Sequence, residues 1–225
     1  MQHYNYFRSG TSHRLRIALN LKGLPTTYQA VNLLAEAHQN PAFLALNPQG
    51  LVPALVLDDG QVLTQSPAII EWLEERYPTP PLLPSGTEAR AHVRALAALV
   101  GCDIHPLNNR RILEYLRQHF GADQAAITAW ASHWIGTGLD AYERLLQTQA
   151  PRGRYSWGDN PTLADVYLIP QVEGARRYHL DLQRWPRIQA IDAATTGTQM
   201  MLCHAYPTHS ATAMNTPLRT ANSCK

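Results

Sequence analysis

The chain has 225 residues with 45% hydrophobic content and a formal net charge of +2. This length and composition predict one large or two small domains with a real core and argue against a disordered protein. The small net charge and the lack of a basic block argue against nucleic acid as a partner. No apolar run reaches ~18 residues, and the N-terminal segment is too polar for a signal peptide. We therefore expect a cytoplasmic protein that does not enter a membrane.

The three cysteines, Cys102, Cys203 and Cys224, are an odd number and have no CxxC spacing. This pattern argues against a disulfide framework and against a zinc site, so we expect no metal. Cys102 is interpreted as a small buried apolar residue.

Short strand patterns alternate with helical ones over residues 1–78, as in a unit that contains a βαβ motif. The expected elements are a strand at 3–7, a helix ending at Gly23, a strand at 27–33, a hairpin at 54–64 and a helix at 66–77. Gly23 stands where a left-handed helix cap is expected. Ser66 is the predicted N-cap of the last helix and Pro67 its first helical residue.

The segment 78–86 contains four prolines and predicts a linker. Beyond it only helical spacing is found, at about 87–119, 123–148, 162–178 and from Pro186 onward. Thr162 and Asp165 predict a capping box at the start of the third of these helices. The predicted organisation is an α/β domain at 1–78, a linker at 79–86 and an all-α domain at 87–225.

This order of elements, together with three motifs, resembles the soluble glutathione transferases over residues 1 to about 194. The motifs are NPQGLVPAL (47–55), LTQSPAIIEWLE (63–74) and WGDNPTLADVYLIP (157–170). The resemblance implies a thioredoxin-like N-terminal domain followed by an all-helical domain, glutathione as cofactor, and a homodimer. RSGTSHRLRIAL further looks like the zeta class, and with GCDIHPLNNRRILEYLR it is similar to the maleylpyruvate isomerases of aromatic-compound degradation and their neighbours, the maleylacetoacetate isomerases.

Two stretches are candidates for binding a peptide cofactor. If Pro53 followed a cis bond, the backbone of Val52 would stay unpaired at the end of a strand, where an extended peptide could add; alternatively, the pair merely ends a strand. Gln65 and Ser66 precede a helix whose free amides and positive end suit a carboxylate. The resemblance makes this the site of the γ-glutamyl group of glutathione, and Gln49 a candidate for its glycine end.

Three hydroxyl residues, Ser9, Thr11 and Ser12, lie where the first strand turns into the first helix. A thiol of ordinary pKa ~8.5 needs hydrogen-bond donors, a helix N-terminus or cations to act as a nucleophile at neutral pH. The alternative role of these residues is to cap the helix, and this is the preferred interpretation of Ser12. Ser9 matches the catalytic serine of the family, and we expect Ser9 and Thr11 to stabilise the thiolate. The zeta class more often has Ser-Ser-Cys where this chain has Ser9, Gly10 and Thr11.

Arginines near the first helix suit a substrate with two carboxylates, because guanidinium groups pair with carboxylates through two parallel hydrogen bonds. Arg8 is expected to point from the strand end toward the site, where it would serve both binding and catalysis. Arg14 and Arg16 are instead predicted to lie on a solvated helix face.

In the helical domain, a kink at Pro106 is expected to direct neighbouring side chains toward a cleft. The resemblance assigns His105 and Asn109 to the neighbourhood of glutathione and Arg110 to the substrate. Arg176 is the further candidate for the distal carboxylate. From the residues alone, Arg176 and its neighbour Arg177 are surface charges of a helix.

The sequence therefore predicts a glutathione-dependent cis–trans isomerase that converts a maleyl keto-acid to its fumaryl isomer. One alternative is a general transferase that conjugates glutathione to electrophiles, against which the arginines argue. Another is a non-catalytic binding module, against which the retained Ser9, Pro53 and Gln65-Ser66 argue. The choice between maleylpyruvate and maleylacetoacetate stays open.

The composition changes from about Thr195, where the chain becomes rich in threonine and loses helical amphipathicity. A shifted reading frame near the end of the gene and an ordinary divergent tail are both compatible with this change. In either case the segment has little apolar area with which to offset its ordering entropy, so we expect its truncation to change little.

Overall fold

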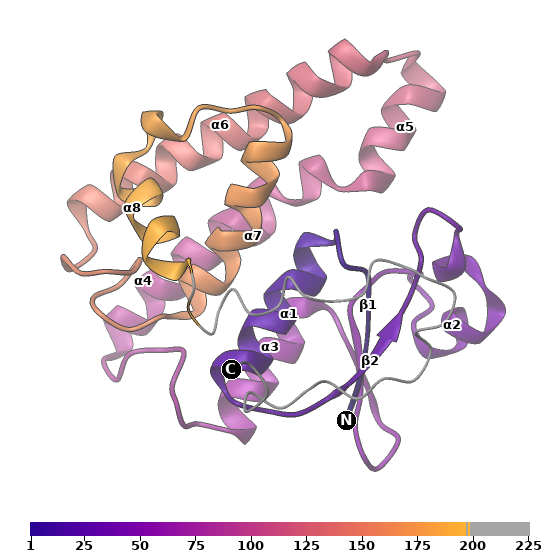
Figure 1. The fold of residues 1–225 in the computed structure, drawn as a ribbon, viewed down its shortest axis with the longest axis horizontal. Helices are drawn as coiled ribbons and strands as arrows, with labels where there is room; N and C mark the ends of the chain where they lie inside the picture. The colour runs from indigo at the N-terminus through magenta and orange to yellow at the C-terminus, as the bar shows by residue number, and fades with distance from the viewer. Residues whose placement is uncertain (197, 199–225) are drawn as a thin grey trace, which may run out of the picture. The chain divides into compact units, whose positions relative to one another are not determined.

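The computed structural model of the protein describes residues 1–196 and 198 (Figure 1). The chain divides into two units, residues 1–80 and residues 81–196. The division falls inside the proline-rich segment 78–86. The predicted effect of the atypical tail concerns residues that lie, apart from the first few, outside the described part of the chain.

The first unit contains a four-stranded mixed sheet with strand order β2-β1-β3-β4. Its elements are β1 (Gln2–Asn5), α1 (Gly10–Leu21), β2 (Thr27–Ala30), the 3-10 helix η1 (Ala37–Gln39), α2 (Pro41–Leu46), β3 (Ala54–Val56), β4 (Val62–Thr64) and α3 (Ser66–Arg76). β1 runs parallel to β2 and antiparallel to β3, and β3 pairs antiparallel with β4. This β-α-β and β-β-α order confirms the predicted thioredoxin-like domain.

The ends of these elements follow from local hydrogen bonding. β1 stops at Asn5 because the chain turns at once, with the Ser9 amide donating to the Tyr6 carbonyl at 3.0 Å. The strand predicted at 3–7 is therefore wrong at its C-terminal end, and β2 likewise ends at Ala30 rather than at 33. Gly23 has a φ of 64° directly after α1, as its predicted capping position requires.

The prediction that Arg14 and Arg16 lie on a solvated helix face is wrong, because both side chains are buried. The Arg16 guanidinium donates to Asn5 Oδ1 at 3.1 Å and to the Phe7 carbonyl at 3.0 Å. The chain leaves the sheet after Asn5, so carbonyls in this turn have no strand partner. A guanidinium group has five N–H donors in a rigid planar arrangement. The Arg16 guanidinium donates to these carbonyls from inside the unit, so they do not stay unpaired.

A buried ion pair fastens the end of α1 to the end of α3. Lys22 Nζ donates to Glu74 Oε2 at 2.7 Å, to the Tyr77 carbonyl at 2.7 Å and to the Pro80 carbonyl at 2.9 Å. Both charged side chains are buried. Breaking such a pair would leave an uncompensated buried charge, so the pair strongly favours one arrangement. Lys22 thereby holds Tyr77 and Pro80, near the end of the first unit, beside the end of α1.

His3 in the middle of β1 is fully buried, and its Nδ1 lies 2.8 Å from Thr26 Oγ1. Burial, with a contribution from the Arg16 charge, lowers the pKa of His3 from 6.5 to about 3. The folded protein therefore binds a proton on His3 less readily than the unfolded chain does. The stability that the neutral ring contributes is complete above pH 6.5 and is lost as the pH falls from 6.5 toward 3.

We predict that the wild-type protein loses roughly 2 kcal/mol more unfolding free energy between about pH 7 and pH 5 than a His3→Gln variant does. Urea denaturation at the two pH values measures this difference. The matched control is His119→Gln, which removes a histidine from an exposed helix surface instead of from the core. Equal pH dependence in the wild type and His3→Gln would contradict the buried neutral histidine.

Every named element among the described residues of the second unit is a helix, which confirms the predicted all-helical fold of this part of the chain. Its elements are α4 (Thr87–Ala98), the π-helix η2 (Leu99–Ile104), the 3-10 helix η3 (Pro106–Asn108), α5 (Arg110–Phe120), α6 (Gln124–Thr148), α7 (Leu163–Arg177), the 3-10 helix η4 (Leu182–Arg184) and α8 (Pro186–Thr195). Among the residues placed in the structure, no helix combines the length and the apolarity that a membrane span requires.

The helical stretch predicted at 87–119 is broken at the expected place, around Pro106. Before that point it also changes from an α-helix to the π-helix η2. η2 packs against α6, where Gly138 leaves room for it. A Cβ at Gly138 would lie 2.2 Å from Ile104 Cγ1. Cys102 lies on η2 and is exposed, so its interpretation as a buried apolar residue is wrong.

The predicted capping box at the start of α7 is confirmed. The Thr162 amide donates to Asp165 Oδ2 at 2.7 Å, and the Ser156 amide donates to Asp165 Oδ1 at 2.8 Å. Burial raises the pKa of the Asp165 carboxyl, and the hydrogen bonds from Ser156 and Thr162 oppose that shift. This carboxylate therefore ties the loop before α7 to the helix start.

Candidate active site

The peptide group of Val52 is the first candidate binding element. The Val52-Pro53 bond is cis, and both residues are buried just before β3 begins at Ala54. The Val52 carbonyl accepts a hydrogen bond from Thr11 Oγ1 at 2.8 Å. Within the described residues the Val52 amide has no hydrogen-bond partner. An extended peptide could therefore pair with this backbone as a further strand.

The hydroxyl residues at the start of α1 form a connected group. Ser9 is the N-cap of α1, because its Oγ accepts from the Ser12 amide at 3.2 Å. The capping role predicted for Ser12 is thus wrong, and Ser12 Oγ instead accepts from the Tyr6 amide at 3.4 Å. Ser9 Oγ lies 2.9 Å from Thr11 Oγ1. Ser9 thus lies at the positive end of α1, an environment that favours a thiolate.

The start of α3 provides a second site for negative charge. Gln65, with a φ of 68°, occupies the N-cap position, and its carbonyl accepts from the Ile69 amide at 3.0 Å. Ser66 is therefore the first helical residue and Pro67 the second, so the prediction of Ser66 as N-cap is wrong by one position. Ser66 Oγ is buried and has no hydrogen-bond partner in the described residues. An orphaned hydroxyl beside the free amides of a helix N-terminus suits a bound carboxylate.

Gln49 is held beside this helix start by a contact that the sequence did not reveal. Gln65 Nε2 donates to Gln49 Oε1 at 2.5 Å. Asn47 shapes the loop that carries Gln49, because its Oδ1 accepts from the Gln49 amide at 3.2 Å and its Nδ2 donates to the Leu51 carbonyl at 2.7 Å. Asn47 is a positioning residue that the sequence argument missed, although its place in the NPQG motif was a signal for a side-chain turn.

The remaining candidate of the first unit is Arg8. It is exposed on the turn between β1 and α1, directly before the Ser9 N-cap. The first unit therefore carries Arg8, the Ser9–Thr11–Val52 group, and the Gln49–Gln65 pair with Ser66.

In the second unit, three candidates share the turn between η2 and α5. His105 follows η2, and Asn109 is the N-cap of α5, with its Oδ1 accepting from the Arg111 amide at 3.1 Å. Arg110 is the exposed first residue of α5. Trp130 Nε1 donates to the Leu107 carbonyl at 2.8 Å and braces the turn from α6. Capping of α5 uses the side-chain oxygen Oδ1 of Asn109. The side-chain nitrogen Nδ2 is the remaining group that could contact a ligand.

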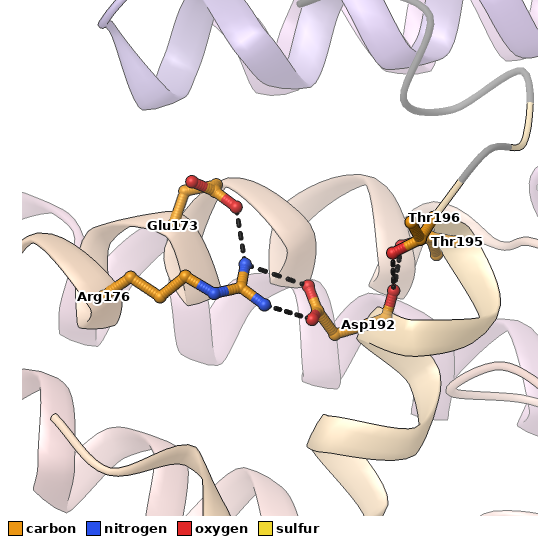
Figure 2. A network of polar contacts seen from close by, with 5 residues as sticks. All are labelled: Glu173, Arg176, Asp192, Thr195 and Thr196. Carbon is orange, nitrogen blue, oxygen red and sulfur yellow. Dashed lines mark hydrogen bonds and ion pairs between the residues drawn. The ribbon is translucent and has the colours of Figure 1, made fainter.

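Arg176 on α7 takes part in a polar network with α8 (Figure 2). Its guanidinium donates to Glu173 Oε1 at 2.5 Å and to both carboxylate oxygens of Asp192. The hydroxyls of Thr195 and Thr196 donate to the Asp192 carbonyl at 2.7 and 3.2 Å. Arg176 therefore already pairs with two carboxylates, and a substrate carboxylate would have to share or replace them.

Known proteins resemble this chain over most of its length. The model of the glutathione S-transferase N-terminal domain matches residues 8–76. A maleylpyruvate isomerase from a Ralstonia species is 68% identical over 195 residues, which cover 86% of this chain and 91% of the relative. The chain belongs to the glutathione transferase family.

Solved structures place it within that family. A holo structure of a maleylpyruvate isomerase, described as a bacterial glutathione transferase of the zeta class, has a TM-score of 0.90 and 62% identity, and covers 93% of this chain and 100% of that one. A maleylacetoacetate isomerase from Methylobacterium extorquens, with bound malonate and glutathione, has a TM-score of 0.87 and 36% identity over 91% of this chain and 96% of that one. The resemblance to the zeta class is confirmed.

The residues of the first unit fit glutathione, which is an extended tripeptide with a free α-carboxylate at one end and a thiol in the middle. Ser66 Oγ and the first amides of α3 are suited to the carboxylate. The Val52 amide is suited to a peptide carbonyl, and Ser9 at the start of α1 to the thiol. Each of these assignments rests on a group with unused hydrogen-bonding capacity or on the positive end of a helix.

We predict that Ser66→Ala weakens glutathione binding about tenfold, because a hydrogen bond to a carboxylate contributes roughly 1.5 to 3 kcal/mol. The melting temperature should not fall, because Ser66 Oγ has no partner within the described residues. Calorimetric titration and thermal unfolding measure the two effects, with exposed Ser85→Ala as control. A Ser66→Ala variant that binds like the wild type would show that the carboxylate lies elsewhere.

Proposed function

We propose that this protein is a glutathione-dependent cis–trans isomerase that converts a maleyl keto-acid to its fumaryl isomer. The observation that carries the proposal is the 68% identity to a maleylpyruvate isomerase over nearly the whole relative. It is supported by a first unit in which Ser9 lies at a helix start, the Val52 carbonyl is held by Thr11 and Ser66 Oγ has no partner among the described residues, an arrangement suited to such a cofactor.

When bound, glutathione supplies a thiolate that adds reversibly to the cis double bond and so permits rotation. The chain's own residues make that chemistry possible. Ser9 would donate to the sulfur from the N-terminus of α1, which lowers the proportion of the neutral thiol. Val52 and Ser66 would fix the peptide, so that its sulfur stays at one position.

Arginines would recognise the substrate and hold its developing charge. Arg8 lies one residue before Ser9, so it is our candidate for the negative charge that grows on the substrate carbonyl oxygen. Arg110 and Arg176 are proposed for the two carboxylates, and His105 and Asn109 for further contacts with glutathione. The malonate bound in the Methylobacterium extorquens relative is itself a dicarboxylate and supports this substrate class.

The proposal also includes a homodimer, a cytoplasmic location and the absence of nucleic acid as a partner. The low net charge supports the last of these. General conjugation of glutathione to electrophiles is the alternative activity. It is less well supported, because the relative with 68% identity to this chain is a maleylpyruvate isomerase.

Mixing the protein with maleylpyruvate or maleylacetoacetate, with and without glutathione, tests the proposed function. We expect the fumaryl product to form only when glutathione is present, and the amount of glutathione to stay constant, as measured by chromatography. Loss of glutathione in proportion to substrate would instead identify a conjugating transferase. The ratio of kcat/KM for the two acids identifies the preferred substrate.

We predict that Arg110→Ala raises the substrate KM at least tenfold and leaves glutathione binding nearly unchanged, because it removes a charge-assisted contact worth roughly 1.5 to 3 kcal/mol. The neighbouring exposed Arg111→Ala is the control. For Arg176 the matched variant is Asp192→Asn, which weakens the ion pair with α8 but keeps the guanidinium. If Arg176 binds substrate, Arg176→Ala raises KM far more than Asp192→Asn does; equal effects would assign Arg176 to the helix contact alone.

A further inference from the structure

The donor and acceptor roles in the Ser9–Thr11–Val52 group follow from the number of available protons. A carbonyl oxygen can only accept, so Thr11 uses its single hydroxyl proton in the 2.8 Å contact with Val52. In the 2.9 Å contact between the two hydroxyls, Ser9 must therefore be the donor. Ser9 Oγ in turn accepts from the Ser12 amide at 3.2 Å. The hydrogen bonds run in one direction, from the Ser12 amide through Ser9 and Thr11 to Val52.

We propose that Thr11 is a positioning residue, which acts on glutathione through the backbone of Val52, and that Ser9 is the one hydroxyl of this pair that donates to the sulfur. This inference rests on the proposed function and adds a role for Thr11. The expectation that both hydroxyls stabilise the thiolate is replaced by two separate roles. Thr11 holds the backbone that receives the peptide, and Ser9 turns its proton from Thr11 to the sulfur when the ligand is in place.

The exchange of hydrogen-bond partners at Ser9 when glutathione binds is energetically favourable. Ser9 gives up a hydrogen bond to a neutral hydroxyl and gains one to a charged sulfur, and hydrogen bonds to ionised groups are about twice as strong as neutral ones. The Ser12 amide keeps its acceptor throughout, because rotation about the Ser9 C–O bond moves only the hydrogen. Thr11 keeps its bond to Val52 in both arrangements.

The place of Val52 explains why Thr11 would affect binding without touching the sulfur. The contact joins residues that are 41 positions apart, the first turn of α1 and the segment just before β3. Val52 is outside the strand, so the sheet does not fix its peptide group. The Thr11 hydroxyl restrains the Val52–Pro53 peptide through its carbonyl, and it thereby limits the backbone conformation of Val52, whose own amide lies in the preceding peptide group.

Two ligands separate the positioning role from a direct role at the sulfur. S-methylglutathione has the same peptide as glutathione but cannot form a thiolate. The affinity of each variant for both ligands is measured by calorimetric titration, and the pKa of the bound thiol by the ultraviolet absorbance of the thiolate against pH. The variants are Thr11→Val, which keeps the shape and removes the hydroxyl, and Thr11→Ser, which restores the hydroxyl.

We expect Thr11→Val to weaken both ligands by the same factor, about five- to tenfold, as the loss of a net hydrogen bond predicts. The pKa of bound glutathione should stay within about 0.3 of the wild-type value, since that pKa responds to groups at the sulfur. Thr11→Ser should regain wild-type affinity. Ser9→Gly, a substitution tolerated at an N-cap, should give the opposite result, with a raised thiol pKa and nearly unchanged affinity for S-methylglutathione.

A Thr11→Val variant that raises the thiol pKa but binds S-methylglutathione normally would overturn the proposal, and so would a variant that behaves like the wild type in all three measurements. Thr11→Ala serves as a second variant if Thr11→Val does not fold. The proposed function fails separately: a wild-type protein that binds both ligands but isomerises neither maleyl acid would refute the activity, while the binding results would still decide the role of Thr11.

Discussion

The Val52 backbone is the element on which the other features of the proposed site depend. It lies outside the sheet, its carbonyl is held by Thr11, and its amide is not used by the described part of the chain. A peptide ligand can complete this backbone in the same way that a neighbouring strand would. In the proposed complex, main-chain hydrogen bonds would supply affinity, and the flanking side chains of Ser9 and Ser66 would determine which peptide fits.

Two helix N-termini in the first unit offer a positive end to anionic groups. α1 begins at the Ser9 cap, where a thiolate is favoured, and α3 begins at Ser66, where a carboxylate is favoured. Neither site needs a charged side chain from the protein. Arg16, which the sequence predicted to lie on a solvated helix face, is instead buried and donates to the carbonyls that follow β1. Arg8 is the arginine of this segment that stays exposed.

Much of this arrangement is readable from the sequence, because short motifs determine local geometry. The thioredoxin-like order, the helical second unit and the Thr162–Asp165 box all follow from periodicity and capping residues. The burial of Arg14 and Arg16 could not be predicted, since it depends on where β1 ends, and the alternating pattern runs two residues past that point. The Ser66 cap was misassigned because Gln65, a residue without cap preference, takes the left-handed conformation. The π-helix at 99–104 also has no local signature, and its packing uses the space that Gly138 leaves beside Ile104 on a helix distant in the sequence.

The most direct test of this account is hydrogen exchange at the Val52 amide, measured by nuclear magnetic resonance in the free protein and with bound glutathione. We expect exchange of this amide to slow by at least tenfold when the ligand binds, because the amide gains a hydrogen-bond partner. The Ala54 amide, already within β3, should change much less. Saturating glutathione that leaves exchange at Val52 unchanged would contradict the account, because the peptide would then bind without pairing to this backbone.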